Sequence, residues 1–400
     1  MRTKHKYFDG EVSASFVSLL TGRMFMFIAS GLLGLFLPIF LYELFGNQYL
    51  WVFAFYGLAS LLYVLTIPIG VKFFDKKFGL QRSLRLSLVF LSLFYVTNYL
   101  VDKSTIFIYI PIGILCLTLF RILFWTPFRT DIAKFTNKRN RGRQMSSFEA
   151  VKMFLAVVLP IASAFIINNF SFDVLFIVSI IIYLSSIIPF KQLPPTKENF
   201  SWSYTETFKE FFYSLKKRKV ALAFLGDGAE SFATLIIWPI FIFELLNGDL
   251  MQVGLLSSFI VLITIVLQLS LGKTMDKRIS KQKMLRWGSL MYSLGWILKI
   301  FIFTAFHVFI VGAYHSITKI FTATPYNTLN YDLSAREGHY VDEYSVIMEM
   351  MIHTGRFLMF VFGFILAGFV GLNWMFVIAA FSALLLNLIS SDDMDFRKHS

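Results

Sequence analysis

Apolar stretches of about 20 residues recur along the whole chain and are separated by short polar connections. At a rise of ~1.5 Å per residue, each stretch is long enough to cross the ~30 Å hydrocarbon core of a bilayer as an α-helix. The pattern predicts about twelve transmembrane helices. They lie near residues 14–43, 49–71, 86–101, 106–127, 147–168, 174–190, 220–245, 250–271, 287–304, 308–325, 344–371 and 373–390.

Several unusual residues of the first half return in the second half at a nearly constant spacing. The stretch PIFLYEL at residues 38–44 recurs as PIFIFEL at residues 239–245, so that its proline and its glutamate both reappear 201 positions later. Three other pairs match at offsets of 201, 198 and 200, namely Asp75 with Asp276, Arg121 with Lys319, and Glu149 with Glu349. The chain therefore contains one six-helix unit twice.

The doubled pattern divides the chain into three parts. Residues 1–190 are predicted to form an N-terminal six-helix bundle, and residues 220–400 a C-terminal one. Residues 191–219 form a polar cytoplasmic linker, in which Ser203 and Glu206 have the spacing of a capping box for a short amphipathic helix on the membrane surface. We expect an all-α integral membrane protein with two bundles in pseudo-twofold parallel repeat.

The charge distribution agrees with a membrane protein. Hydrophobic residues make up 57% of the chain and charged residues 15%, whereas soluble domains have about 25% charged residues. The net charge of +13 by itself would be compatible with a nucleic-acid partner. Most Lys and Arg residues, however, lie in alternate connections and in the two tails, as the positive-inside rule requires. This sorting places both termini in the cytoplasm and argues against nucleic-acid binding.

The N-terminal residues and the single cysteine add two expectations. Basic residues precede an apolar run, as in a signal peptide, but the run continues to Leu44 without a convincing cleavage site, so we expect a retained first helix. Cys116 is the only cysteine, which excludes an intramolecular disulfide; we expect it in the core of the fourth helix.

Two parallel six-helix repeats, each with an Asp-Lys loop after its second helix, resemble the major facilitator superfamily over the whole chain. The loop pattern of that superfamily is Gly-x-x-x-Asp-(Arg/Lys)-x-Gly-(Arg/Lys)-(Arg/Lys). The second half keeps Gly272, Asp276 and Lys277, and the first half keeps Asp75 and Lys76. The resemblance implies that these loops latch the cytoplasmic side closed. In the alternative interpretation they are charged loop residues that only obey the topology.

The resemblance also assigns roles to whole helices. The twelve helices of the family form four consecutive groups of three, or triplets. In each triplet, the first helix lines a central cavity, the second lies between the bundles, and the third faces lipid. A charge at bilayer depth costs at least ~2.5 kcal/mol and therefore marks a partner or a water-filled cavity. The first helices carry Arg23, Arg121, Asp227, Glu230, His315 and Lys319, and the second carry Glu149, Lys152, Glu349, His353 and Arg356. The third helices carry only Lys299, which we expect to snorkel outward.

Asp227 and Glu230 form the deepest acidic pair and lie three residues apart on one face of the seventh helix. Gly226 and Gly228 should loosen the helix at Asp227. Two carboxylates in a partly dry cavity resist simultaneous ionisation, so one of them is a candidate proton carrier. In the alternative interpretation both are permanently neutralised as structural ion pairs by Arg23, Arg121 or Lys319.

The remaining charges have two interpretations each. Arg121 and Lys319 would form a basic floor to the cavity or reach the inner interface, and His315 would be a ligand or a packed polar residue. On the eleventh helix, Glu349, His353 and Arg356 form one stripe at i, i+4 and i+7. We expect a buried salt-bridge ladder there, with protonation sensing through His353 as the alternative. The resemblance implies that Asp75 contacts the start of this helix, close to Glu349.

The function predicted is secondary active transport of a small organic solute by alternating access, coupled to protons. The sequence has no phosphate-binding loop, Cys/His metal cluster or nucleophile motif, so we expect no enzyme activity and no cofactor. Pro160 and the small residues 162–164 weakly match the family's antiporter motif and favour efflux. Uptake symport of a nutrient such as a sugar or organic acid, or a receptor that does not cycle, are the alternatives. We expect a monomer that contacts lipid in a bacterial inner membrane.

Overall fold

The computed structural model describes residues 14–135, 141–194, 200–213, 215–275, 280–336 and 341–390. In these ranges the secondary structure is helical, and no β-strand occurs in them. The chain divides into two compact units by its internal contacts. The first contains residues 14–33 and Ile69–Ser201, and the second contains residues 34–68 and 202–390. The predicted boundaries at residues 190 and 220 stay a prediction, since residues 34–68 group with the later part of the chain.

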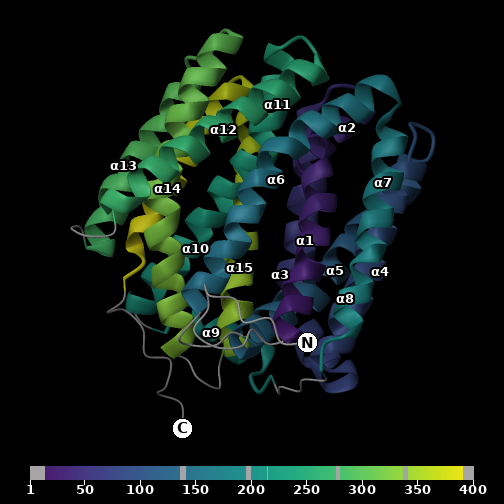
Figure 1. The fold of residues 1–400 in the computed structure, drawn as a ribbon, viewed down its shortest axis with the longest axis vertical. Helices are drawn as coiled ribbons and strands as arrows, with labels where there is room; N and C mark the ends of the chain where they lie inside the picture. The colour runs from purple at the N-terminus through teal and green to yellow at the C-terminus, as the bar shows by residue number, and fades with distance from the viewer. Residues whose placement is uncertain are drawn as a thin grey trace. The chain divides into compact units, whose positions relative to one another are not determined.

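The first unit is built around α4, which packs against α5, α7 and α8, while α6 packs against α7 (Figure 1). Its elements are α1 (Ala14–Gly34), the end of α3 (Tyr49–Phe78), α4 (Leu80–Leu100), α5 (Ile106–Phe135), α6 (Arg141–Asn169), α7 (Phe172–Ser185) and α8 (Ile187–Lys191). Gly22 lets α1 approach α8, because a Cβ there would lie 2.8 Å from the ring of Phe190. Cys116 is buried in α5, as expected for a core residue of the fourth span.

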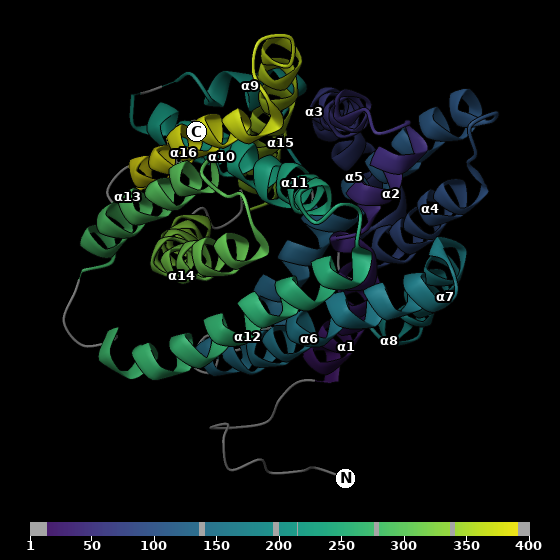
Figure 2. The ribbon, with the colours of Figure 1, turned by 90° about the horizontal axis from the view of Figure 1, so that it is seen from above.

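In the second unit, α10 packs against α15 and α16, and α13 packs against α14 and α16 (Figure 2). Its elements are α2 (Leu37–Leu44), most of α3, α9 (Tyr204–Glu210), α10 (Leu215–Phe232), the π-helix η1 (Ala233–Ile237), α11 (Trp238–Leu245), α12 (Leu250–Met275), α13 (Lys281–Lys299), α14 (Ala305–Arg336), α15 (Val341–Leu366), the 3₁₀-helix η3 (Leu372–Trp374), α16 (Met375–Leu385) and the 3₁₀-helix η4 (Leu386–Leu388).

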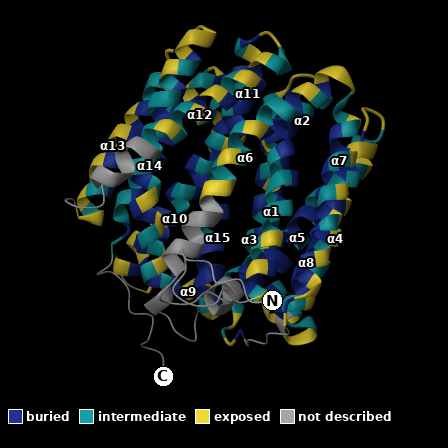
Figure 3. Ribbon diagram, viewed as in Figure 1, coloured by how far each residue is buried: buried dark blue, intermediate teal, exposed yellow. Residues whose placement is uncertain are grey.

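The helices have the length and surface of a membrane protein. Nine helical stretches of the described residues are long and apolar enough to cross a bilayer. Helices also lie in the other three predicted ranges, near residues 287–304, 308–325 and 373–390. Of these, α13 and α14 are not apolar enough to count as membrane-crossing by composition, and Leu372–Leu388 is too short. Large apolar side chains stay exposed on both units, among them Phe154 and Trp287. Exposed positions, yellow in Figure 3, recur along many of the helices. Lipid accounts for such exposure, and the number of twelve crossings stays a prediction.

The repeated PIF segments end in the same kind of turn. Gly46 and Asn47 follow α2 with φ of 68° and 62°, and Asn247 and Gly248 follow α11 with φ of 52° and 83°. Gly and Asn are the residues that adopt this left-handed conformation most readily. The two copies therefore use the same two residue types in opposite order to end a helix.

The two copies also contact each other through positions that match in the repeat. The ring of Phe243 lies edge-on to that of Tyr42, with centroids 6.3 Å apart. The hydroxyl of Tyr42 donates a hydrogen bond to Oε1 of Glu244. The reverse hydrogen bond is not possible. Phe243 occupies the position of Tyr42 in the second copy and has no hydroxyl to donate to Glu43, the counterpart of Glu244.

Local caps define several helix ends outside the spans. The predicted capping box is confirmed: the backbone N–H of Glu206 donates to Ser203 Oγ at 3.2 Å, and that of Ser203 to Glu206 Oε2 at 2.7 Å. Before α12, the backbone N–H of Gln252 donates to Asp249 Oδ1 at 2.9 Å. This hydrogen bond holds the pKa of Asp249 below its usual value, because it favours the carboxylate form.

Candidate functional site

Helix α10 approaches its neighbours closely because of two glycines in the stretch LGDGAESF. A Cβ on Gly228 would lie 1.8 Å from the carbonyl oxygen of Ile352 in α15, and one on Gly226 would lie 2.6 Å from that of Ser382 in α16. The helix stays regular through Phe232. The expectation that these glycines loosen it is therefore wrong: the missing side chains let two other helices pack against it.

The irregular part of this span lies one turn later. Residues 233–237 form a π-helix, which joins α10 to α11. A π-turn inserts extra backbone into a helix and is often found at functional sites. Here it contains Thr234, whose hydroxyl donates a hydrogen bond to Oε1 of Glu230 at 2.5 Å.

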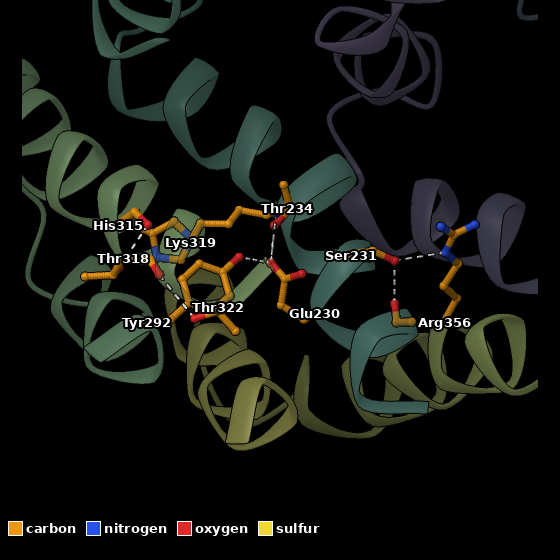
Figure 4. A network of polar contacts seen from close by, with 10 residues as sticks. Glu230, Ser231, Thr234, Tyr292, His315, Thr318, Lys319, Thr322 and Arg356 are labelled. Carbon is orange, nitrogen blue, oxygen red and sulfur yellow. Dashed lines mark hydrogen bonds and ion pairs between the residues drawn. The ribbon is translucent and has the colours of Figure 1, made fainter. Parts of the chain in front are cut away.

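Glu230 is the centre of a polar cluster inside the second unit (Figure 4). Its Oε1 accepts hydrogen bonds from Tyr292 of α13 and from Thr234, and Nζ of Lys319 in α14 lies 3.6 Å away. The residue is 3% exposed and stands midway along the Leu215–Leu245 stretch, the position of the bilayer midplane if that stretch spans it. A carboxylate at this depth needs such partners to remain ionised.

Asp227 lies one turn before Glu230 but has different surroundings. It is half-buried, and the charged groups that act on it electrostatically are Glu230, Lys319 and Arg356. Within the described part of the chain, no cation lies at ion-pair distance from its carboxylate. The structure thus brings the two predicted acids into one cluster, in which Glu230 has the direct ion pair.

Lys299 is enclosed by aromatic rings instead of snorkelling outward. Its Nζ lies 3.9 Å from the ring centroid of Trp238 and 3.8 Å from that of Trp296, with Phe376 at 5.9 Å. The residue is 2% exposed. The expectation of snorkelling is wrong, because the helix end packs against the start of α11 and against α16, whose rings attract a cation.

His315 is packed between two aromatic side chains. Its ring centroid lies 4.4 Å from that of Tyr292 and 4.5 Å from that of Trp296. Gly295 makes room for it, since a Cβ there would be 2.8 Å from His315 Nδ1. Among the described residues, this buried Nδ1 has no hydrogen-bond partner. The geometry is that of the packed polar residue, and a role in binding stays a prediction.

The predicted stripe on α15 is a chain of contacts. Nε2 of His353 lies 3.8 Å from Glu349 Oε2 and 3.2 Å from Arg356 Nη1. Figure 4 shows the next contact, in which Arg356 Nε donates to Ser231 Oγ at 3.0 Å. The ring of Tyr63 in α3 lies edge-on to His353, with centroids 4.5 Å apart. The three residues therefore lie in one chain of contacts, whereas the salt-bridge ladder and its part in conformational change stay predictions.

The two candidate arginines belong to the first unit. The guanidinium of Arg23 in α1 lies 5.4 to 5.5 Å from the ring centroids of Phe124, Trp125 and Phe128 in α5. Arg121 is half-buried in the same helix. Arg23 therefore makes cation–π contacts within its own unit.

For most of the predicted latch residues, the side chains lie outside the described part of the chain. Lys76 is exposed near the end of α3. Asp75 and Glu149 lie in α3 and α6, and Gly272 in α12, but their side-chain surroundings are outside the described residues. The same holds for the whole of Asp276 and Lys277. The latch stays a prediction.

Four residues of the cluster were not predicted from the sequence. They are Thr234, Tyr292, Trp296 and Lys299. Lys299 stands out as the only charge in the third helices of the triplets, so its sequence position was a usable signal. Threonine, tyrosine and tryptophan are common in apolar spans, and only the packing of α10, α13 and α14 shows that these three residues surround charges.

Comparisons with known proteins bear on the family and the fold of the chain. The family model of the Major Facilitator Superfamily matches residues 19–341. The chain belongs to the major facilitator superfamily. A search of the curated proteins found no match. The predicted family and fold class are thereby confirmed, and a chain of this family is a multi-pass membrane transporter.

Solved transporter structures have a similar fold over almost the whole length of this chain. One is a POT family transporter in complex with 5-aminolevulinic acid, with a TM-score of 0.67 and 12% identity, covering 96% of each chain. Another is the peptide transporter POT in complex with sulfate, also with a TM-score of 0.67 and 12% identity, covering 96% of this chain and 94% of the other. At this identity the likeness shows the fold alone.

Proposed function

We propose that this protein is a secondary active transporter of a small organic solute, driven by protons, in which Glu230 is the proton-binding group. The observation that carries the proposal is the buried carboxylate of Glu230, midway along its span and paired with Lys319 at 3.6 Å. Ionisable groups at the bilayer midplane commonly form ion or proton pathways, and transporters of this kind bind solutes at that depth. Asp227 is the second candidate, since it acts electrostatically on the same cluster.

The wider proposal concerns how the solute crosses the membrane. Two six-helix bundles, residues 1–190 and 220–400, would expose a central site alternately to each side. The stripe of Glu349, His353 and Arg356 and the latch residues of the two Asp-Lys loops would stabilise one of the two states. The direction of transport is open at this level: Pro160 and its small neighbours favour efflux antiport, and uptake symport is the alternative.

Purified full-length protein in proteoliposomes tests this proposal. A solute identified by thermal-shift screening should accumulate inside the vesicles, or leave them, when a pH gradient is imposed. Glu230→Gln should abolish this proton-driven movement but keep solute exchange in the absence of a gradient, because exchange needs no net proton transfer.

The matched control is Asp332→Asn, the same loss of a carboxylate charge on an exposed residue that pairs with Lys281. It should transport like the unmodified protein. Proton-driven accumulation that persists in both Glu230→Gln and Asp227→Asn would refute the proton-carrier role. A protein that binds solute but moves none would favour the receptor that does not cycle.

A further inference from the structure

The two partners of the Glu230–Lys319 ion pair are unequally accessible. The side chain of Glu230 is 4% exposed, whereas that of Lys319 is 41% exposed. Glu230 is also covered by the hydroxyls of Tyr292 and Thr234. A solute that reaches this pair therefore meets the ammonium first, and the carboxylate lies behind it.

The partners of Glu230 also differ in whether they tolerate its protonation. A hydroxyl can donate or accept a hydrogen bond, so Tyr292 and Thr234 can stay hydrogen-bonded to a protonated Glu230. An ammonium can only donate, and its attraction depends on the negative charge. A proton on Glu230 therefore weakens the contact with Lys319 and leaves the two hydroxyl contacts possible.

Lys299 cannot take the place of Lys319 as the group that meets the solute. Its ammonium lies between two tryptophan rings and is 2% exposed. In the described ranges no carboxylate lies at ion-pair distance from it, although it acts electrostatically on Glu230 and Lys319. It is a buried basic group behind the pair.

Titratable groups on four helices surround Glu230. Helices α15 and α16 pack against α10, and α13 and α14 reach Glu230 through Tyr292 and Lys319. The sequence of α16 has no ionisable residue. The titratable groups of the other helices in the cluster are Asp227 on α10, Tyr292 and Lys299 on α13, His315, Lys319 and Tyr326 on α14, and Glu349, His353 and Arg356 on α15. A proton on Glu230 raises the net charge of this cluster by one.

We propose that the solute carries an anionic oxygen group, such as a carboxylate, that binds the ammonium of Lys319 when Glu230 takes up a proton. The inference rests on the proposed proton-coupled transport. The proton adds one positive charge to the cluster and the anion one negative charge, so that binding of both leaves its net charge unchanged. No covalent bond changes.

This arrangement makes the proton and the solute bind with positive coupling. Thermodynamic linkage then requires each to raise the affinity for the other. Groups that bind together move together, which corresponds to symport. A cationic solute would instead need the ionised Glu230 and would compete with the proton, as in antiport. The accessible ammonium therefore favours transport of an organic anion together with a proton over the efflux antiport that Pro160 and its small neighbours suggest.

The test uses full-length protein in nanodiscs and three size-matched panels of probes: mono- and dicarboxylates with sulfonates and phosphate monoesters, primary amines, and neutral amides and alcohols. Thermal stabilisation should come from members of the anionic panel. Comparison of the carboxylates, sulfonates and phosphate monoesters within this panel shows which anionic group the protein recognises. If only amines stabilise the protein, or if no anion does, the proposal is overturned.

The best anion is then titrated by calorimetry between pH 5 and 8. Its affinity should rise by up to about tenfold for each unit of pH decrease, because one proton is linked to binding. Glu230→Gln should bind at least as tightly as the unmodified protein does at low pH, and its affinity should not change with pH. Lys319→Gln should lower the affinity for the anion about tenfold or more, whereas Lys319→Arg should retain binding. The exposed control Lys281→Gln should bind the anion as the unmodified protein does.

A second measurement does not depend on any variant. Titration in two buffers of different ionisation enthalpy should show uptake of up to one proton for each anion bound. Release of protons, or loss of anion binding in a folded Glu230→Gln protein, would overturn the inference. Proton-driven flux of an amine with no anion binding would overturn it too, yet leave the proposed transport function standing. Absence of any proton-driven flux would count against both.

Discussion

At the scale of single residues, the surroundings of Lys299 show how an aromatic site can replace an ion pair. A desolvated cation–π contact contributes about 2 kcal/mol or more, against a cost of several kcal/mol for removing an ammonium from water. The ring centroids of Trp238 and Trp296 lie within 4 Å of the ammonium of Lys299, and the carboxylate of Glu230 is nearby; both reduce that cost. The side chain therefore remains buried where its stem was expected to reach outward.

Lys299→Met should keep the fold, because methionine fills a similar volume and has no charge to desolvate. We expect the midpoint of thermal unfolding to stay within a few degrees of that of the unmodified protein. Trp296→Ala should lower stability by about 3 to 5 kcal/mol, since a fully buried indole is lost. Lys281→Met is the control for loss of an exposed lysine. A large loss of stability in Lys299→Met would show that the ammonium makes an indispensable ion pair.

Sequence reasoning found three charged members of this cluster and missed Lys299 and most of the neutral partners. A charge inside an apolar span is rare and costly, so Asp227, Glu230 and Lys319 could be identified one residue at a time. Trp238 and Lys299 are 61 positions apart in the sequence, and nothing local indicates that they touch. Their contact depends on how α11, α13 and α16 pack, which a pattern along one chain does not contain.

At the scale of helices, the contact of α10 with α15 depends on glycine on both sides. A Cβ on Gly228 would meet the carbonyl of Ile352, and one on Gly355 would lie 2.0 Å from the carbonyl of Leu225. Each substitution would push the two backbones apart. Because Glu230 and Arg356 stand on these helices, the same contact also sets the position of the polar cluster.

Gly228→Ala and Gly355→Ala should each destabilise the protein by about 1 to 3 kcal/mol, the usual cost of overpacking. Gly34→Ala is the matched control, since it is a helical glycine with no atom within 4 Å of the position that an added methyl group would take; it should be neutral or slightly stabilising. Thermal unfolding of purified variants in the same detergent gives the comparison. Equal melting of Gly228→Ala and Gly34→Ala would contradict the close approach of α10 and α15.

The sequence predicted where these helices lie but not their irregularities. Apolar length gave a range for every span, and the offset of 201 residues related α2 to α11. The π-helix at residues 233–237 has no counterpart in that repeat, in which a turn at Leu35 and Phe36 joins α1 to α2. A π-turn is stabilised by its tertiary contacts, so hydropathy alone does not reveal it.

At the scale of the whole molecule, the doubling seen in the sequence and the family membership lead to the same fold. The repeat was visible because prolines and acids are rare inside apolar runs, so even a few matches at one offset were informative. The contacts divide the described chain differently, since residues 34–68 group with residues 202–390. The repeat in the sequence shows which segments correspond to each other in the two halves, whereas the contacts show which segments pack together in this structure.

The orientation in the membrane can be tested because the chain has a single cysteine. Cys116 is 7% exposed, and Cys116→Ala should give a folded background without thiols. In that background, Ser104→Cys lies in the exposed turn between α4 and α5, and Ser201→Cys lies in the exposed segment before α9. The distribution of Lys and Arg predicts that the first position faces the outside and the second the cytoplasm.

A membrane-impermeant maleimide applied to intact cells should therefore label Ser104→Cys and leave Ser201→Cys unlabelled until the membrane is permeabilised. Between the two positions lie α5, α6 and α7 with α8, three spans that should carry the chain from one side to the other. Labelling of both positions from the outside would mean that one of these helices does not cross. Since the repeat applies the same plan to both halves, that result would remove the doubled six-helix topology together with the cytoplasmic placement of both termini.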